Sequence, residues 1–206
     1  MNRRVVVTGV GVVSPLGTGG RNGMFWENLL VGNSGLKDVK DVKTPIWNGA
    51  LSECPISLVG QIDRQDPLLN PTGMSSKKSA HPDFVEFALL AAKFALDDSK
   101  LLNMSSGNKN ERFGVAIGNG GIGSLQEIIS SYRNREISYK KLSPFFVPRT
   151  LLNMAAGNVS IKFGLQGPNH SVATACAAGT HSVGDAFNFI RLGMADAMLA
   201  GNSYPT

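Results

Sequence analysis

The chain has 206 residues, of which 42% are hydrophobic and 17% are charged, and this balance suits one compact globular unit or part of a larger one. No run approaches the roughly 20 apolar residues of a transmembrane helix, so we expect no membrane span. The formal net charge is +5, and we expect most of this charge to form a solvated face. The alternative is an acidic partner, and because no basic run is interleaved with aromatic residues, a small acidic protein is favoured over nucleic acid.

The first third of the chain predicts a strand, a helix and a long insertion. β-Branched valines predict a buried strand over residues 4–8, and apolar periodicity predicts a helix over 23–31 that ends at the glycines of 32–35. Periodicity fades and prolines accumulate over 36–73, which indicates a surface insertion with one short strand near 57–60. Two arginines before an apolar run resemble a signal peptide, but glycines interrupt that run and no convincing cleavage site follows it.

The middle of the chain carries a glycine-rich turn between a strand and a helical segment. A helix is expected from Pro82 to about Leu102, and a buried strand over 113–117. That strand leads into residues 118–123, GNGGIG, which match the dinucleotide fingerprint GxGxxG letter for letter. The fingerprint also requires a long helix, a second strand and an acidic residue about 20 positions on, whereas here a short helical segment runs into 133–141. We favour a tight turn that brings the backbone close to a substrate over a nicotinamide or flavin site.

The last third predicts a helix from about Pro148 to Gly164, a short strand over 171–174, a second helix that begins at Cys176, and a strand over 197–200. Strands that alternate with helices predict an α/β layered sandwich with a mostly parallel sheet.

Cys176 stands at the predicted junction of a strand and a helix. Unpaired N–H groups and the helix dipole stabilise a thiolate at such a place, and the small residues 177–179 leave room for a substrate to reach the sulfur. A lone cysteine is also a small hydrophobe that is often buried, so local chemistry leaves both interpretations open. The only other cysteine, Cys54, forms no CxxC with it, which indicates a reducing compartment.

Five motifs in order resemble those of the β-ketoacyl-[acyl-carrier-protein] synthases: Val5–Gly17, Ser143–Pro148, Asn153–Gly157, Gly167-Pro168 and Thr174–Gly179. The spacing through 158–163 and 184–193 is similar to that of mitochondrial members of fungal type. The resemblance implies a thiolase-like fold, in which two similar α/β halves pack together. Residues 1–206 would form the N-terminal synthase domain, incomplete at its C-terminal end and without the second half. The second and third motifs disfavour a thiolase or related acyltransferase.

The resemblance also implies an acyltransferase of fatty acid biosynthesis. It would perform a decarboxylative Claisen condensation of malonyl-acyl carrier protein with an acyl group carried on Cys176, whose N–H would contribute to the oxyanion hole. Ile122 and Phe146 would line the acyl-chain pocket, with Phe146 reaching the neighbouring subunit of a homodimer. Lys77 would contact acyl carrier protein. Core packing for the first two, and a solvated lysine for the third, stay open as alternatives.

No cofactor is implied, because the substrates travel on the phosphopantetheine of acyl carrier protein, and the implied compartment is the mitochondrion, with the cytoplasm as the alternative. The resemblance gives His81, His170 and His181 no catalytic role, and their spacing with the cysteines forms no zinc-ligand pattern. The family's catalytic histidines belong to the second half. We therefore expect the 206-residue product alone to be unstable or aggregating and unable to complete condensation. The alternative is a non-enzymatic product that binds acyl carrier protein or a full-length subunit.

Overall fold

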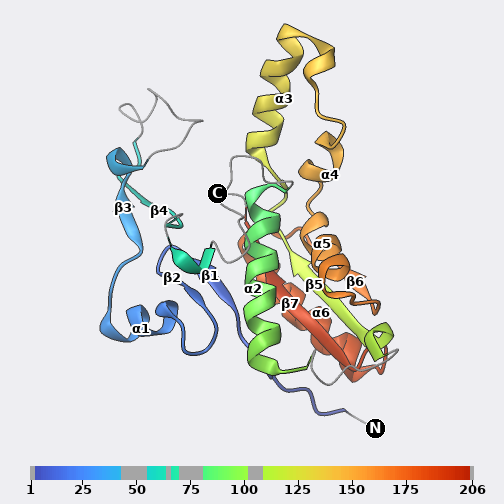
Figure 1. The fold of residues 1–206 in the computed structure, drawn as a ribbon. Helices are drawn as coiled ribbons and strands as arrows, with labels where there is room; N and C mark the ends of the chain where they lie inside the picture. Colours follow the sequence, from blue (N-terminus) through green and yellow to red (C-terminus); the bar gives the residue numbers. More distant parts are fainter. Residues whose placement is uncertain (1–2, 43–54, 64–65, 70–80, 102–108, 205–206) are drawn as a thin grey trace.

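A small parallel sheet lies at the centre of the chain. The computed structural model describes residues 3–42, 55–63, 66–69, 81–101 and 109–204 (Figure 1). Strand β5 (Phe113–Gly118) pairs in parallel with β6 (Asn169–His170) along one edge and with β7 (Ala197–Asn202) along the other. All six residues of β5 are buried, as expected for the middle strand of a parallel sheet that is covered on both faces.

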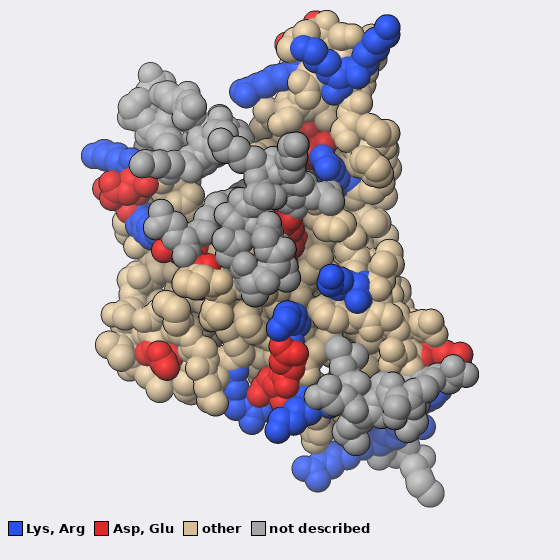
Figure 2. All heavy atoms as spheres, viewed as in Figure 1, with Lys and Arg blue, Asp and Glu red and all other residues tan. Residues whose placement is uncertain are grey.

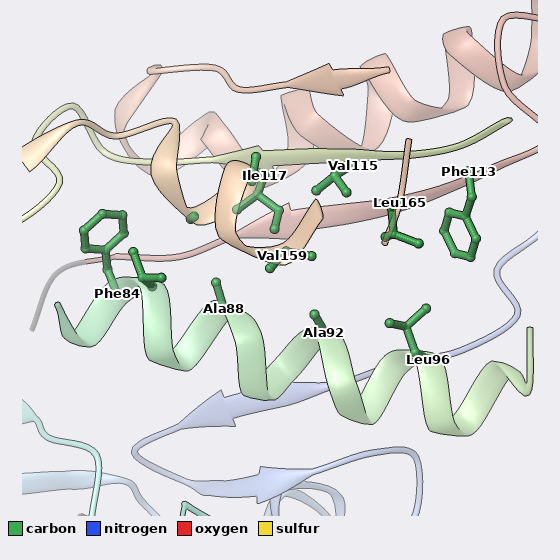
Figure 3. Packing of buried hydrophobic residues seen from close by; sticks show 12 residues of the cluster. Phe84, Ala88, Ala92, Leu96, Phe113, Val115, Ile117, Val159 and Leu165 are labelled. Carbon is green, nitrogen blue, oxygen red and sulfur yellow. The ribbon is translucent and has the colours of Figure 1, made fainter. Parts of the chain in front are cut away.

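One face of the sheet packs on two helices, α2 (Asp83–Ser99) and α5 (Met154–Phe163). Figure 3 shows one side of α2 turned towards the sheet, with α5 between them. The α2 residues recur every fourth position, which places them on a single face of the helix. The labelled members of this core are Phe84, Ala88, Ala92, Leu96, Phe113, Val115, Ile117, Val159 and Leu165.

The other face of the sheet carries helix α6 (Ala178–Arg191). Alternate residues of a strand point to opposite faces, so Gly114, Ala116 and Gly118 lie opposite the core of α2 and α5. A Cβ atom on Gly118 would lie 2.6 Å from the backbone oxygen of Ala178, which explains why a glycine ends β5 where α6 begins. The result is a layered α/β sandwich with helices on both faces.

The remaining elements lie outside this sandwich core. Strands β1 (Val12–Ser14) and β2 (Gly17–Gly19) form an antiparallel hairpin, and β3 (Leu36–Asp38) pairs antiparallel with β4 (Leu58–Gly60). The other helices are α1 (Met24–Val31), α3 (Leu125–Ile137), α4 (Phe146–Thr150) and five described 3-10 turns: Val39–Asp41, Pro67–Leu69, Lys109–Arg112, Tyr139–Lys141 (η6) and Ala175–Ala177 (η7).

The predicted strand over 4–8 is wrong. The central sheet consists of β6, β5 and β7 alone among the described strands, and the valine run forms no ladder with any of them. The chain instead follows α2, where Gly9 and Gly11 lie directly against the backbone of Ala95 and Ala91. Val6 and Val7 are exposed. A β-branched composition was therefore not sufficient to predict a buried strand here.

Two other boundaries differ from the predictions. The helix expected over 148–164 is two helices, α4 and α5, with an extended backbone at Leu151 after α4. The Thr150 carbonyl at the end of α4 accepts a hydrogen bond from Gly123 N at 3.1 Å. The expected end of α5 is confirmed, since Gly164 has φ 64°. The strand expected over 171–174 lies earlier, as β6, and only Ala173 forms an isolated bridge, with Asn119.

Candidate active site

Cys176 lies in the 3-10 turn η7, directly before α6 begins at Ala178. Its side chain is exposed and forms no disulfide. The preceding residue, Ala175, has φ 48°, a left-handed conformation that costs a non-glycine residue energy. The sequence predicted the cysteine in the first turn of the helix, and the structure places it two residues earlier, on a strained turn that exposes the sulfur.

Contacts from both directions along the chain hold this turn. Thr174 shares a hydrogen bond of 2.8 Å between its Oγ1 and Nδ1 of His181, and its carbonyl accepts from Ala177 N at 3.1 Å. The Ala175 carbonyl accepts from Ala178 N and from the hydroxyl of Tyr204, the latter at 2.7 Å. Strain of this kind persists only where the surroundings determine the conformation, and here side chains from α6 and from beyond β7 do so.

The glycine-rich turn after β5 (residues 118–123) lies beside η7, the cysteine turn, and is organised by the side chain of Asn119. This fully buried side chain accepts a hydrogen bond from Gly121 N at 3.1 Å and donates to the Ser203 carbonyl at 2.9 Å. Gly121 has φ 127°, which favours glycine there. The expected tight turn is therefore present.

The two residues predicted to line an acyl pocket lie on adjacent segments. Ile122 is half exposed in the glycine-rich turn, and Phe146, half buried, begins α4. Gly123 N donates to Thr150 O, which joins the turn to the end of α4. Arg149 of α4 also forms an ion pair of 3.5 Å with Glu127 of α3. The segments that carry both residues therefore meet, while the pocket roles of the side chains stay predictions.

Lys77, the residue predicted to contact acyl carrier protein, lies outside the described residues, as does Cys54. Within the described part of the chain, basic side chains gather at the far end of α3 and on η6, at the upper end of the view in Figure 2. These exposed residues are Arg133, Arg135, Lys140 and Lys141. They present a positive surface on a projecting part of the molecule.

The three histidines have separate environments. His170 Nε2 lies 3.1 Å from Asp185 Oδ2, which ties β6 to α6, and His181 bonds to Thr174. Burial, and secondarily the positive charge of Arg149, lower the pKa of His81.

Among the described residues, no group of three or more His, Cys, Asp or Glu side chains is placed to hold a metal ion. Within the same part of the chain, no helix is long and apolar enough to cross a membrane.

Sequence reasoning missed two residues of this site. Asn119 could have been noticed, because a polar residue that directly follows a buried strand can organise a glycine-rich turn through its side chain. Tyr204 gave no sequence signal, because its partner Ala175 lies 29 positions away and belongs to a different element.

Comparison with solved structures assigns the fold to the thiolase-like ketosynthases. A structure of a type II PKS acyl-carrier protein in complex with its ketosynthase bound to the hexaketide matches with a TM-score of 0.76 and 29% identity, over 98% of this chain and 45% of that one. Residues 2–204 match the family model described as "Beta-ketoacyl synthase, N-terminal domain". The chain therefore belongs to the β-ketoacyl synthase family.

Curated relatives agree with this assignment. The chain is 41% identical to a 3-oxoacyl-[acyl-carrier-protein] synthase homolog of Saccharomyces cerevisiae, over 98% of this chain and 48% of the relative. It is 39% identical to a mitochondrial 3-oxoacyl-[acyl-carrier-protein] synthase of Arabidopsis thaliana, over 98% of this chain and 45% of the relative. Bacterial 3-oxoacyl-[acyl-carrier-protein] synthases match as well. The chain spans about half the length of the curated relatives it matches.

Proposed function

We propose that this chain contributes the acyl-accepting half of a 3-oxoacyl-[acyl-carrier-protein] synthase of fatty acid biosynthesis, with Cys176 as the nucleophile. The observation that carries the proposal is the exposed free thiol of Cys176 on the left-handed turn before α6, in a member of the β-ketoacyl synthase family. Cys176 lies two residues before the N-terminal, positive end of α6, and small residues follow it at 177–179.

The first step is acyl transfer. Cys176 Sγ attacks the thioester carbonyl of an acyl group on phosphopantetheine, and a new carbon–sulfur bond forms while the carbonyl oxygen becomes an oxyanion. The tetrahedral intermediate collapses, the bond to the phosphopantetheine sulfur breaks, and the proton of the Cys176 thiol ends on the departing thiol. The Cys176 N–H suits the oxyanion, since no hydrogen bond from it to an acceptor occurs among the described residues.

The second step belongs to the whole protein. Malonyl-acyl carrier protein loses CO₂, its α-carbon attacks the acyl carbonyl on Cys176, and the bond between that carbon and the cysteine sulfur breaks. The cysteine leaves as a thiolate that takes up a proton from solvent, and the product, two carbons longer, stays on acyl carrier protein. Ile122 and Phe146 are proposed to line the acyl-chain pocket. Support comes from the hydrogen bond between Gly123 and Thr150, which brings the segments of both residues together.

Acyl carrier protein is the proposed partner, with Lys77 as a contact. Two observations support an acidic partner: the positive surface on α3 and η6, and the similar ketosynthase whose structure is a complex with its acyl-carrier protein. The name of the Arabidopsis relative supports a mitochondrial location, although the bacterial matches carry no such indication. A homodimer in which Phe146 reaches the partner subunit is part of the same proposal.

Mass spectrometry of the chain after incubation with an acyl-acyl carrier protein tests the nucleophile. We expect one acyl group, located on the Cys176 peptide, and complete loss of that adduct in Cys176→Ala. Cys54→Ala is the matched control and should retain the adduct. Acylation on Cys54, or none on either cysteine, would reject the proposed role. Binding to acyl carrier protein without acylation in the wild type would instead favour a non-enzymatic binding protein.

A further inference from the structure

The chain beyond β7 is fixed against both turns of the candidate site. Ser203 is buried and donates through its backbone N to Gly118 O at 3.1 Å and through its hydroxyl to Phe84 O at 2.5 Å. Its carbonyl accepts from the Asn119 side chain at 2.9 Å. Three hydrogen bonds on one buried residue determine where the next residue, Tyr204, can lie.

Tyr204 bridges the glycine-rich turn and the cysteine turn. Its ring lies against Gly120, since a Cβ atom on that glycine would approach the ring carbon Cε1 to 3.0 Å. Its hydroxyl donates to the Ala175 carbonyl at 2.7 Å, a short hydrogen bond. The ring contacts the glycine-rich turn and the hydroxyl bonds to the cysteine turn. Tyr204 therefore sets the distance between these two turns.

The Ala175 carbonyl belongs to the same peptide group as the Cys176 N–H. A trans peptide is planar, so its N–H points away from its C=O, and a donor that fixes the oxygen also fixes the direction of the hydrogen. Ala178 N and the Tyr204 hydroxyl both donate to this oxygen. Hydrogen bonding at the oxygen also polarises the amide and strengthens its N–H as a donor.

The hydrogen bond from Ala178 N would not by itself fix the direction of the Cys176 N–H. Its bond to Ala175 is local to η7 and turns with it, and Ala175 already has an unfavourable φ. Tyr204 is held by β5 and by the start of α2 through Ser203, so it ties the peptide group to the sheet and not only to its own turn.

We propose that Tyr204 is a positioning residue that orients the Ala175–Cys176 peptide group, so that the Cys176 N–H points at the oxyanion formed when Cys176 is acylated. This inference rests on the proposed function of Cys176 and adds to it a residue outside the five motifs. Tyr204 acts through the peptide and does not touch the substrate.

Two reagents separate orientation from simple disorder of the turn. Acylation of Cys176 by an acyl thioester passes through an oxyanion, whereas alkylation by iodoacetamide displaces iodide and forms none. Tyr204→Phe keeps the ring and removes the hydroxyl, so we expect acylation to slow about fivefold, the effect of losing one hydrogen bond, while alkylation changes by less than about twofold. Tyr132→Phe, an exposed tyrosine on α3, is the matched control and should alter neither rate.

Equal loss of both rates in Tyr204→Phe would mean general disorder and would overturn the proposal, as would an unchanged acylation rate. A wild-type chain that is alkylated but not acylated would count against the proposed function instead.

A second measurement reports on the Ala175–Cys176 peptide group directly and does not require acylation activity. With two cysteines, ¹⁵N-cysteine labelling gives two amide signals, and Cys176→Ser identifies the one from Cys176. We expect Tyr204→Phe to shift that signal and leave the Cys54 signal in place; an unmoved Cys176 signal would contradict the inference.

Discussion

Cys176 owes its position to residues far away in the sequence. Ala175 adopts a left-handed conformation that its own side chain disfavours, and the contacts that hold it come from α6 and from the segment after β7. Behind these contacts lies Asn119, which fixes both the glycine-rich turn and the carbonyl of Ser203. One buried amide therefore supports the two segments that flank the sulfur.

Removing this amide should destabilise the chain. Asn119→Ala removes two hydrogen bonds and leaves the Gly121 N–H and the Ser203 carbonyl without their partner, at a cost of about 2–4 kcal/mol in the free energy of unfolding. Urea denaturation followed by circular dichroism measures the change. Asn188→Ala, at an exposed position on α6, is the control and should change the free energy by less than about 0.5 kcal/mol. Equal stability of the two variants would show that Asn119 contributes little.

Among the helices and strands, sequence patterns predicted the elements whose position depends on interactions within a single segment. The helix expected over 23–31, the buried strand after Arg112 and the end of α5 at Gly164 all appear, because periodicity, unbroken apolar runs and glycine caps act within one segment. The path of the chain around residues 4–11 and the end of α4 involve partners elsewhere: the backbone of α2 against Gly9 and Gly11, and the bond from Gly123 to Thr150. For the site, the sequence indicated Cys176 and the glycine turn, but not the cross-chain bond from Tyr204.

One ion-pair cluster joins three separate segments at the start of the sheet. Asp196, just before β7, accepts hydrogen bonds from Arg112 at 2.7 and 3.0 Å and from Arg3 at 2.9 Å. These bonds, from Arg112 first and then from Arg3, lower the pKa of Asp196 from its ordinary value of 3.8 to about 2. The stabilisation is therefore fully present above about pH 4 and is lost as the pH falls through about 2.

Comparison with Asp196→Asn measures this contribution. The Asp196 side chain is 58% exposed, so solvent and salt screen the pair, and we expect the wild type to melt only about 1–2 °C above the variant at pH 5. The difference should shrink towards pH 2 and also on addition of salt at pH 5. A difference that grows as the pH falls from 4 to 2 would have the wrong sign for a carboxylate of lowered pKa.

Over the molecule as a whole, the outer side of α6 is one of the surfaces that leave apolar side chains exposed. The inner face of α6 buries Ala178, Ser182 and Ala186 against the sheet, while Val183 and Phe187, one turn apart, are 52% and 44% exposed on the other side. Neighbouring exposed apolar side chains on one helix face favour association. We expect the 206-residue chain to self-associate as its concentration rises and to bind a hydrophobic dye, as measured by sedimentation velocity and by dye fluorescence.

The double variant Val183→Ser and Phe187→Ser tests whether this face is responsible. Removing both apolar side chains should reduce dye binding by roughly half and shift the onset of association to higher concentration. Neither side chain belongs to the buried core, so the fold should survive, as the far-ultraviolet circular dichroism would show. Ile161→Ser is the control, because Ile161 is 77% exposed on α5, on the opposite face of the sheet. If Ile161→Ser reduces association as much as the double variant, the α6 face has no special role, and the apolar surface acts only through its total area.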